Sequence, residues 1–169
     1  MVYYNMHMTQ KSKNTLKQNI CWVFVFLYIA WIFSNSLSDG TLSSAESGTV
    51  TRFLLGILGK FGITLSYDLF HHFVRKLAHF SEYALLGLLT CIAIRKKPLM
   101  KNPKVNWLLF GILPPLLDET IQLFVPGRSG ALKDSLLDMS GFLFGSLFFL
   151  FCTFVYTHFR KKHTILQVI

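Results

Sequence analysis

One uncharged apolar run near the N-terminus constrains the fold of this chain more than any other feature. Residues 20–33 read ICWVFVFLYIAWIF and hold no charged side chain. A helix of about 20 such residues spans the hydrocarbon core of a bilayer, which is about 30 Å thick. The composition agrees, because 52% of the 169 residues are hydrophobic and only 15% are charged. The sequence therefore predicts an integral membrane protein, and it excludes a disordered chain or a secreted disulfide scaffold.

Four apolar segments each have the length of a membrane-spanning helix. They cover residues 20–37, 77–94, 105–125 and 132–159. We therefore expect an all-α fold, namely an integral membrane four-helix bundle. The predicted organisation is a cytoplasmic N-terminal segment (1–19), a membrane domain (20–159) and a cytoplasmic C-terminal tail (160–169).

The first segment has an alternative interpretation as a cleaved signal peptide, because small residues such as Ser34 and Ser36 follow its apolar run. Cleavage would remove a helix that the bundle needs, so we favour a retained span. Cys21, Cys91 and Cys152 all fall in predicted spans without the spacing of a metal site. We expect them to act as small apolar side chains.

The loop 38–73 connects the first two predicted spans and is the only long loop. Within it, Ser43-Ser44-Ala45-Glu46 has the form of a capping box. Apolar residues then recur at helical spacing from Val50 to Phe61. This pattern predicts a short external amphipathic helix, which lies on the membrane surface, covers the mouth of the bundle or packs on the other helices.

Basic residues indicate the orientation, because Lys and Arg accumulate in cytoplasmic loops. With both termini in the cytoplasm, 11 of the 17 Lys and Arg residues lie on that side. We therefore expect a multi-pass protein of the bacterial cytoplasmic (inner) membrane with both termini cytoplasmic. The net charge of +9 reflects this topology, so we expect no nucleic-acid partner.

Ionisable residues inside a span are costly, and here they gather on particular helix faces. Arg75, His79 and Glu82 stand at i, i+4 and i+7, and therefore on one face. Asp134 and Asp138 share a face with small residues, Gly141 and Gly145, which let a neighbouring helix approach closely.

The third predicted span carries its polar residues at the end that follows Pro114-Pro115. These residues are Asp118, Glu119 and Gln122. Proline removes a backbone hydrogen bond, so we expect a kink just before the acids. Glu82, Asp118 and Asp138 lie at similar depths along their helices, about 7 to 12 Å from the outer ends. We therefore predict a polar pocket that opens to the outside.

The linker Pro126-Gly127-Arg128-Ser129-Gly130 lies at the mouth of the predicted pocket. Ser129 suits the N-cap of the fourth span, and a helix N-terminus beside an arginine binds anions. A lipid phosphate is the natural ligand for this linker together with Arg75 and Lys76. The alternative is that Arg128 only meets lipid headgroups at the membrane interface.

Four interpretations of the intramembrane acids remain open. The acids form a structural ion-pair network with Arg75 and Lys76, a binding or acid–base site, a metal site, or part of a proton-coupled transporter. For the acid–base site the catalytic candidates are His79, Glu82, Asp118, Glu119, Asp134 and Asp138. The substrate-binding candidates are Arg75, Lys76, Gln122, Arg128 and Ser129. The metal candidates are His79 and Glu82, and the sequence assigns no cofactor.

Three stretches of the sequence carry a resemblance to a known family. They are Phe33–Ser36 followed by Ser43–Ser47, then RKLAHFSEYALLG (75–87), and DETIQLFVPGRSGALKDSLLDMSGFLFG (118–145). With these stretches the chain resembles the VanZ-like family of bacterial membrane proteins over roughly residues 20–155. The family's polar positions would fall on Arg75, Lys76, His79, Glu82, Asp118, Glu119, Gln122, Arg128, Asp134 and Asp138.

The resemblance implies an inner-membrane protein whose namesake contributes to resistance against teicoplanin, a lipid-tailed glycopeptide. That agrees with an outward-facing site for a membrane lipid or a lipid-linked envelope precursor as partner. The second hypothesis is a non-catalytic membrane factor that changes drug access or supports a partner protein. The long Phe-rich faces also suit an oligomer.

The predicted orientation can be tested by thiol labelling in intact cells. In a cysteine-free background, Ser129→Cys should react with a membrane-impermeant maleimide, whereas Lys101→Cys should be protected until the cells are opened. The reverse pattern of labelling would place the termini on the outside and contradict the prediction.

Overall fold

The computed structural model describes residues 2–128 and 132–166, with side chains for residues 19–128 and 133–160. Over these residues the chain forms five helices and no strand. The all-α prediction is therefore confirmed. The helices are α1 (Val2–Ser36), α2 (Gly40–Lys60), α3 (Tyr67–Lys96), α4 (Pro103–Gln122) and α5 (Leu132–Leu166).

Three helices in the described part of the chain are long and apolar enough to cross a membrane. Their apolar stretches are Asn19–Ser36 in α1, Tyr67–Lys96 in α3 and Lys133–Arg160 in α5. The helix that corresponds to the third predicted span, α4, is not among them. It has polar residues near both ends and Pro114 and Pro115 in its middle, which lower its mean hydropathy. The four-span bundle thus remains a prediction.

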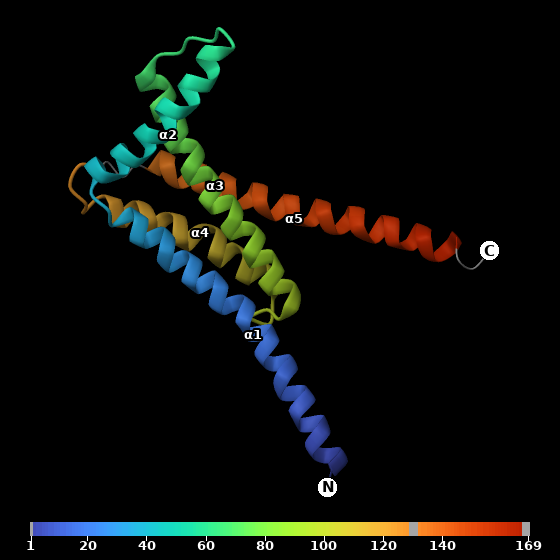
Figure 1. Cartoon of the computed structure of the whole chain (residues 1–169). Helices are drawn as coiled ribbons and strands as arrows, with labels where there is room; N and C mark the ends of the chain where they lie inside the picture. Colours follow the sequence, from blue (N-terminus) through green and yellow to red (C-terminus); the bar gives the residue numbers. More distant parts are fainter. Residues whose placement is uncertain (1, 129–131, 167–169) are drawn as a thin grey trace.

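The helices are arranged around α3. In Figure 1, α1, α3 and α4 run side by side, and α5 crosses α3 before it extends away from the other helices. Among the described residues, the contact between α3 and α5 is the most extensive, and α4 touches α1, α3 and α5. Large side chains on the second half of α5, such as Phe151, Phe154 and Phe159, are exposed. This apolar surface suits lipid or another protein.

Glycine residues bring α3 and α5 into backbone contact. A Cβ atom added to Gly141 or Gly145 of α5 would collide with the carbonyl oxygen of Phe80 or Ala84. A Cβ added to Gly87 of α3 would collide with the carbonyl oxygen of Phe142. The predicted close approach at Gly141 and Gly145 is confirmed, because only a residue without a side chain fits at these positions.

An apolar core away from the polar end fixes α1 against the other helices. Trp22 of α1 packs on Phe110 of α4, with ring centroids 5.0 Å apart. The Trp22 indole Nε1 also donates a hydrogen bond of 2.7 Å to the Lys97 carbonyl oxygen, just after α3. Val25 and Leu86 are fully buried in the same core. These contacts fix α1 relative to α3 and α4. The polar residues lie at the other end of the same helices.

The start of α2 differs from the prediction. Asp39 is the N-cap, and its carboxylate accepts a hydrogen bond of 2.9 Å from the Thr41 backbone nitrogen. Ser43-Ser44-Ala45-Glu46 therefore lies inside the helix, and the capping-box prediction was wrong. The earlier start follows from a tertiary contact, because Gly40 packs against Gly127 and its backbone nitrogen donates to the Pro126 carbonyl oxygen at 3.2 Å.

The glycine contacts between α3 and α5 predict the effect of adding one methyl group. Gly145→Ala should destabilise the protein by about 1 to 3 kcal/mol, because the backbone carbonyl of Ala84 cannot move aside cheaply. The matched control is Gly56→Ala in α2, where an added Cβ meets no atom within 4 Å. Thermal unfolding in detergent should show a lower Tm for Gly145→Ala and an unchanged or higher Tm for Gly56→Ala. Equal Tm values would contradict the backbone contact.

Candidate functional site

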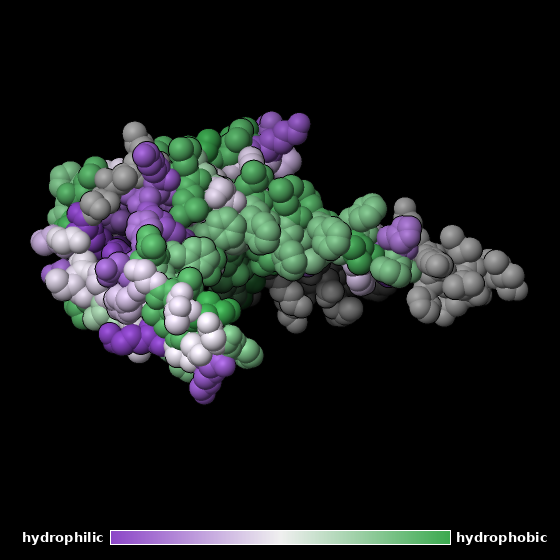
Figure 2. Space-filling model, turned by 90° about the horizontal axis from the view of Figure 1, so that it is seen from above, coloured by the Kyte–Doolittle hydropathy of each residue, from purple (hydrophilic) through white to green (hydrophobic). Residues whose placement is uncertain are grey.

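A polar pocket of about 420 Å³ lies between the end of α1, the first half of α2 and α3. Figure 2 shows hydrophilic residues gathered at this end of the molecule, whereas the surface along α5 is apolar. The helix α2 forms one wall of this pocket and packs on α3, and its position relative to a membrane stays a prediction. The charged or titratable residues that line this pocket are Glu46, Arg75, His79, Glu82 and Arg128.

The face of α3 that was predicted from spacing does line the pocket. Arg75, His79 and Glu82 all point into it. Glu82 accepts a hydrogen bond of 3.4 Å from the Asn35 side-chain nitrogen of α1. The Tyr28 hydroxyl also donates to the Glu82 backbone oxygen at 3.2 Å. Two contacts from α1 thus position Glu82 at the pocket wall.

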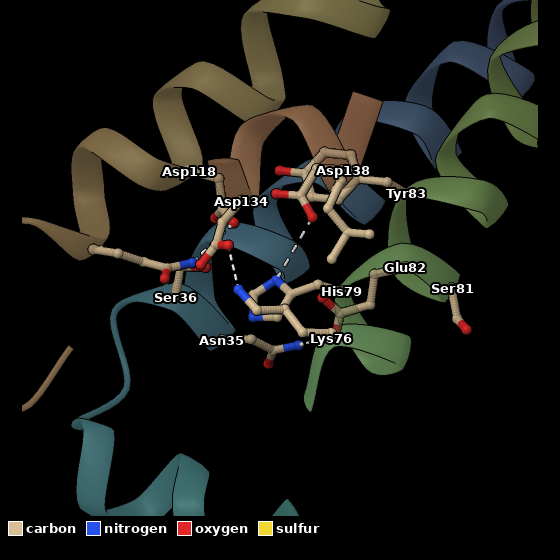
Figure 3. A network of polar contacts seen from close by, with 12 residues as sticks. Asn35, Ser36, Lys76, His79, Ser81, Glu82, Tyr83, Asp118, Asp134 and Asp138 are labelled. Atoms are coloured by element: carbon tan, nitrogen blue, oxygen red, sulfur yellow. Dashed lines mark hydrogen bonds and ion pairs between the residues drawn. The ribbon is translucent and has the colours of Figure 1, made fainter. Parts of the chain in front are cut away.

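A second group of side chains lies deeper, where α3, α4 and α5 meet. His79, Asp118 and Asp138 each offer one ligand atom, and these atoms lie within 4.8 Å of one another. Figure 3 shows the three side chains pointing toward one another, and the His79 Nδ1 atom lies 4.0 Å from the Asp138 Oδ1 atom. We call these three residues the buried cluster. Asp118 and Asp138 have no exposed surface.

The three acids that the sequence placed at a similar depth, Glu82, Asp118 and Asp138, have different surroundings. Asp118 and Asp138 belong to the buried cluster, while Glu82 lies in the polar pocket. His79 belongs to both, because it lines the pocket and also faces the two aspartates. The sequence predicted a common depth for the acids, but it could not show which of them the pocket reaches.

Polar contacts tie α4 to α1 and α3 beside the buried cluster. The Gln122 side-chain nitrogen donates to Asp118 Oδ2 at 3.2 Å and to the Ser36 hydroxyl at 3.4 Å. The Tyr83 hydroxyl donates to the Pro114 carbonyl oxygen at 3.3 Å. Glu119, on the next position of α4, is also buried. The helix continues through both prolines, and the predicted kink stays a prediction.

Of the predicted ion-pair network of Arg75 and Lys76 with the intramembrane acids, one pair is present among the described residues. Lys76 forms an ion pair with Asp134, and the two side chains are 30% and 29% exposed. Arg75 donates a hydrogen bond of 3.5 Å to the Ser44 hydroxyl. Within the described residues, neither cation forms a salt bridge with Glu82 or Asp138. A partly exposed pair such as Lys76–Asp134 contributes about 0.2 to 1 kcal/mol.

Arg128 binds backbone rather than standing free in the pocket. Its Nε atom donates to the Ser38 carbonyl oxygen at 2.9 Å, and a terminal nitrogen donates to the Asn35 carbonyl oxygen at 2.8 Å. Both acceptors lie at the C-terminal end of α1, where carbonyl groups lack helical partners and favour a cation. Burial, followed by the charge of Arg75, lowers the pKa of Arg128. Arg128 therefore fastens the linker to α1.

Ser129, the predicted cap and phosphate contact, lies outside the described residues. Three residues of the site were missed by the sequence reasoning: Asn35, Ser36 and Tyr83. Asn35 and Ser36 follow the first apolar run and belong to one of the stretches that resembled a known family. The polarity of Asn35 and Ser36 at the end of a predicted span was the sequence signal that could have identified them as site residues. Tyr83 carried no signal, because a tyrosine in a span usually packs like any other aromatic side chain.

Residues 20–159 match the family model described as VanZ/LLP1. No curated protein and no solved structure matches the chain.

The contacts of Arg128 predict a structural effect that Arg75 does not share. Arg128→Ala should destabilise the protein by about 1 to 3 kcal/mol, because two charge-assisted hydrogen bonds to α1 are lost. Arg75→Ala is the matched control, since its one hydrogen bond is long, and it should leave the Tm nearly unchanged. Thermal unfolding of the detergent-solubilised variants measures both. A larger loss for Arg75→Ala would contradict this assignment.

Proposed function

The chain belongs to the VanZ/LLP1 family, and we propose that it binds an anionic, lipid-linked envelope component in the polar pocket, at the outer face of the bacterial inner membrane. The observation that carries the proposal is Arg75. Its guanidinium lines the pocket, and within the described residues it has no carboxylate partner. An arginine in this position suits a phosphate, which accepts two parallel hydrogen bonds from the guanidinium group.

A neighbouring groove supplies the place for the apolar part of such a ligand. It has a volume of about 300 Å³ and lies between α1 and α3, lined by Phe24, Leu27, Tyr28, Trp31 and Leu89. Trp31 lines both this groove and the polar pocket. A ligand with an anionic head and a hydrocarbon tail therefore finds a continuous surface, with the head at Arg75 and the tail along α1 and α3.

Glu82 is the best placed acid–base residue for a reaction on the bound headgroup. Its carboxylate is in the polar pocket and is held by Asn35. Asp118 is fully buried, so of these two acids Glu82 is the one that lines the pocket. His79 lines the polar pocket and also belongs to the buried cluster. It is the second candidate for proton transfer.

The second candidate function is a non-catalytic membrane factor that supports a partner or changes the access of a drug. The contacts of Lys76 with Asp134 and of Arg128 with α1 favour it, because these charged residues hold helices together. A contribution to teicoplanin resistance is compatible with either candidate, since that glycopeptide also carries a lipid tail.

Native mass spectrometry with a matched pair of lipids tests the proposal. We expect one polyprenyl phosphate to bind the wild-type protein, and the polyprenol of equal length to bind at least about 10-fold more weakly, because it lacks the charge that Arg75 recognises. Arg75→Gln should lose the phosphate preference. Arg52→Gln is the control, since Arg52 is exposed on α2 outside the pocket, and it should retain the preference.

The remaining outcomes separate the two candidate functions. Glu82→Gln should still bind polyprenyl phosphate, because it keeps the shape of the pocket and only removes the acid. Equal binding of the phosphate and the alcohol to the wild-type protein would overturn the proposed phosphate site and favour the non-catalytic factor.

A further inference from the structure

The buried cluster brings together three potential metal ligands from three separate helices. His79 comes from α3, Asp118 from α4 and Asp138 from α5, and their ligand atoms lie within 4.8 Å of one another. Figure 3 shows that the side chains converge on one region between the helices. The residues are far apart in the sequence, so helical periodicity within one segment did not place them together.

The atoms that face one another in this cluster lack hydrogen-bond partners. They are His79 Nδ1, Asp118 Oδ1 and both side-chain oxygens of Asp138. Asp118 and Asp138 are fully buried. Buried polar atoms are nearly always hydrogen-bonded, and a buried carboxylate without compensation is very costly. The arrangement therefore requires something that satisfies these atoms.

No side-chain cation among the described residues fulfils that requirement. Lys76, the lysine nearest in sequence to His79, pairs with Asp134 instead. Arg128 donates to backbone oxygens of α1, and Arg75 to Ser44. Two carboxylates carry two negative charges, and a single divalent cation would neutralise both.

The donor set suits a divalent transition-metal ion. One imidazole nitrogen and two carboxylate oxygens are ligands that Zn²⁺ and Mn²⁺ accept, and three protein ligands leave a position for water or another group. Metal–ligand bonds of about 2.1 Å place tetrahedral ligands about 3.4 Å apart. The ligand atoms, which lie within 4.8 Å of one another, therefore need to approach by up to about 1.4 Å. Gln122 holds the other oxygen of Asp118, as residues around metal ligands commonly do.

We propose that His79, Asp118 and Asp138 bind one divalent transition-metal ion, Zn²⁺ or Mn²⁺, between α3, α4 and α5. Glu82, which the sequence suggested as the partner of His79, is not part of this site. The site borders the polar pocket, because His79 lines both. Metal binding is nonetheless independent of the lipid proposal, since it is measured without any lipid ligand.

The first experiment uses the wild-type full-length protein in detergent. After purification, elemental analysis should find about one Zn²⁺ or Mn²⁺ ion per chain, or chelator-treated protein should take up one equivalent of either metal in calorimetric titration and gain a higher Tm. Substitution with Co²⁺ should give visible d–d bands without the strong near-ultraviolet bands of thiolate ligands, which excludes binding at Cys21, Cys91 or Cys152.

Matched variants then locate the metal. His79→Gln and Asp138→Asn should each weaken metal binding at least about 10-fold. The controls are Asp134→Asn, one helical turn away on α5, and Glu82→Gln, which removes the acid of the pocket. Both controls should keep the wild-type affinity.

Two outcomes would overturn the metal site. One is a wild-type protein that binds neither Zn²⁺ nor Mn²⁺ in stoichiometric amounts, which would mean that protons neutralise the buried aspartates. The other is a loss of metal in Glu82→Gln with retention in Asp138→Asn. The metal titration of the wild-type protein tests the proposal by itself, so the result does not depend on whether each variant folds. Metal binding in the absence of any preference for polyprenyl phosphate would retain this inference and reject the lipid proposal.

Discussion

The close backbone approach of α3 and α5 is the interaction on which the rest of the structure depends. Gly87, Gly141 and Gly145 each leave no room for a side chain against the facing helix. Because the backbones touch there, the first turns of α5 lie directly over the polar half of α3. That contact sets Asp134 beside Lys76 and Asp138 beside His79. A larger residue at one of the glycines would separate both pairs together.

A second constraint is the cost of charge in an apolar environment. The protein divides the charged residues of the site between an open polar pocket and a cluster with two fully buried aspartates. In the pocket, water can solvate Arg75 and Glu82. In the cluster, solvation must come from neighbouring groups or a bound cation, because an isolated buried ion is strongly destabilising. His79 links the two environments, which makes it the residue whose substitution should affect both.

Much of the fold and part of the site followed from sequence patterns. The spacing of Arg75, His79 and Glu82 predicted one face of α3, and that face lines the pocket. The small residues on α5 predicted a close helix contact, which the structure has. The start of α2 was predicted wrongly at Ser43, because the contact of Gly40 with Gly127 favours Asp39 as the N-cap. The partners of Arg128 were also missed, since they are backbone carbonyls, which no sequence pattern identifies.

The sequence by itself determined the helical class, the apolar stretches and the face on which each polar residue lies, because these depend on local periodicity and hydropathy. Only the tertiary structure decided which faces meet. Helix crossing and rotation depend on side-chain packing between distant segments. They bring His79 together with Asp118 and Asp138, and they direct Lys76 to Asp134. For that reason the polar face of α3 was predictable, while the grouping of His79 with the two aspartates was not.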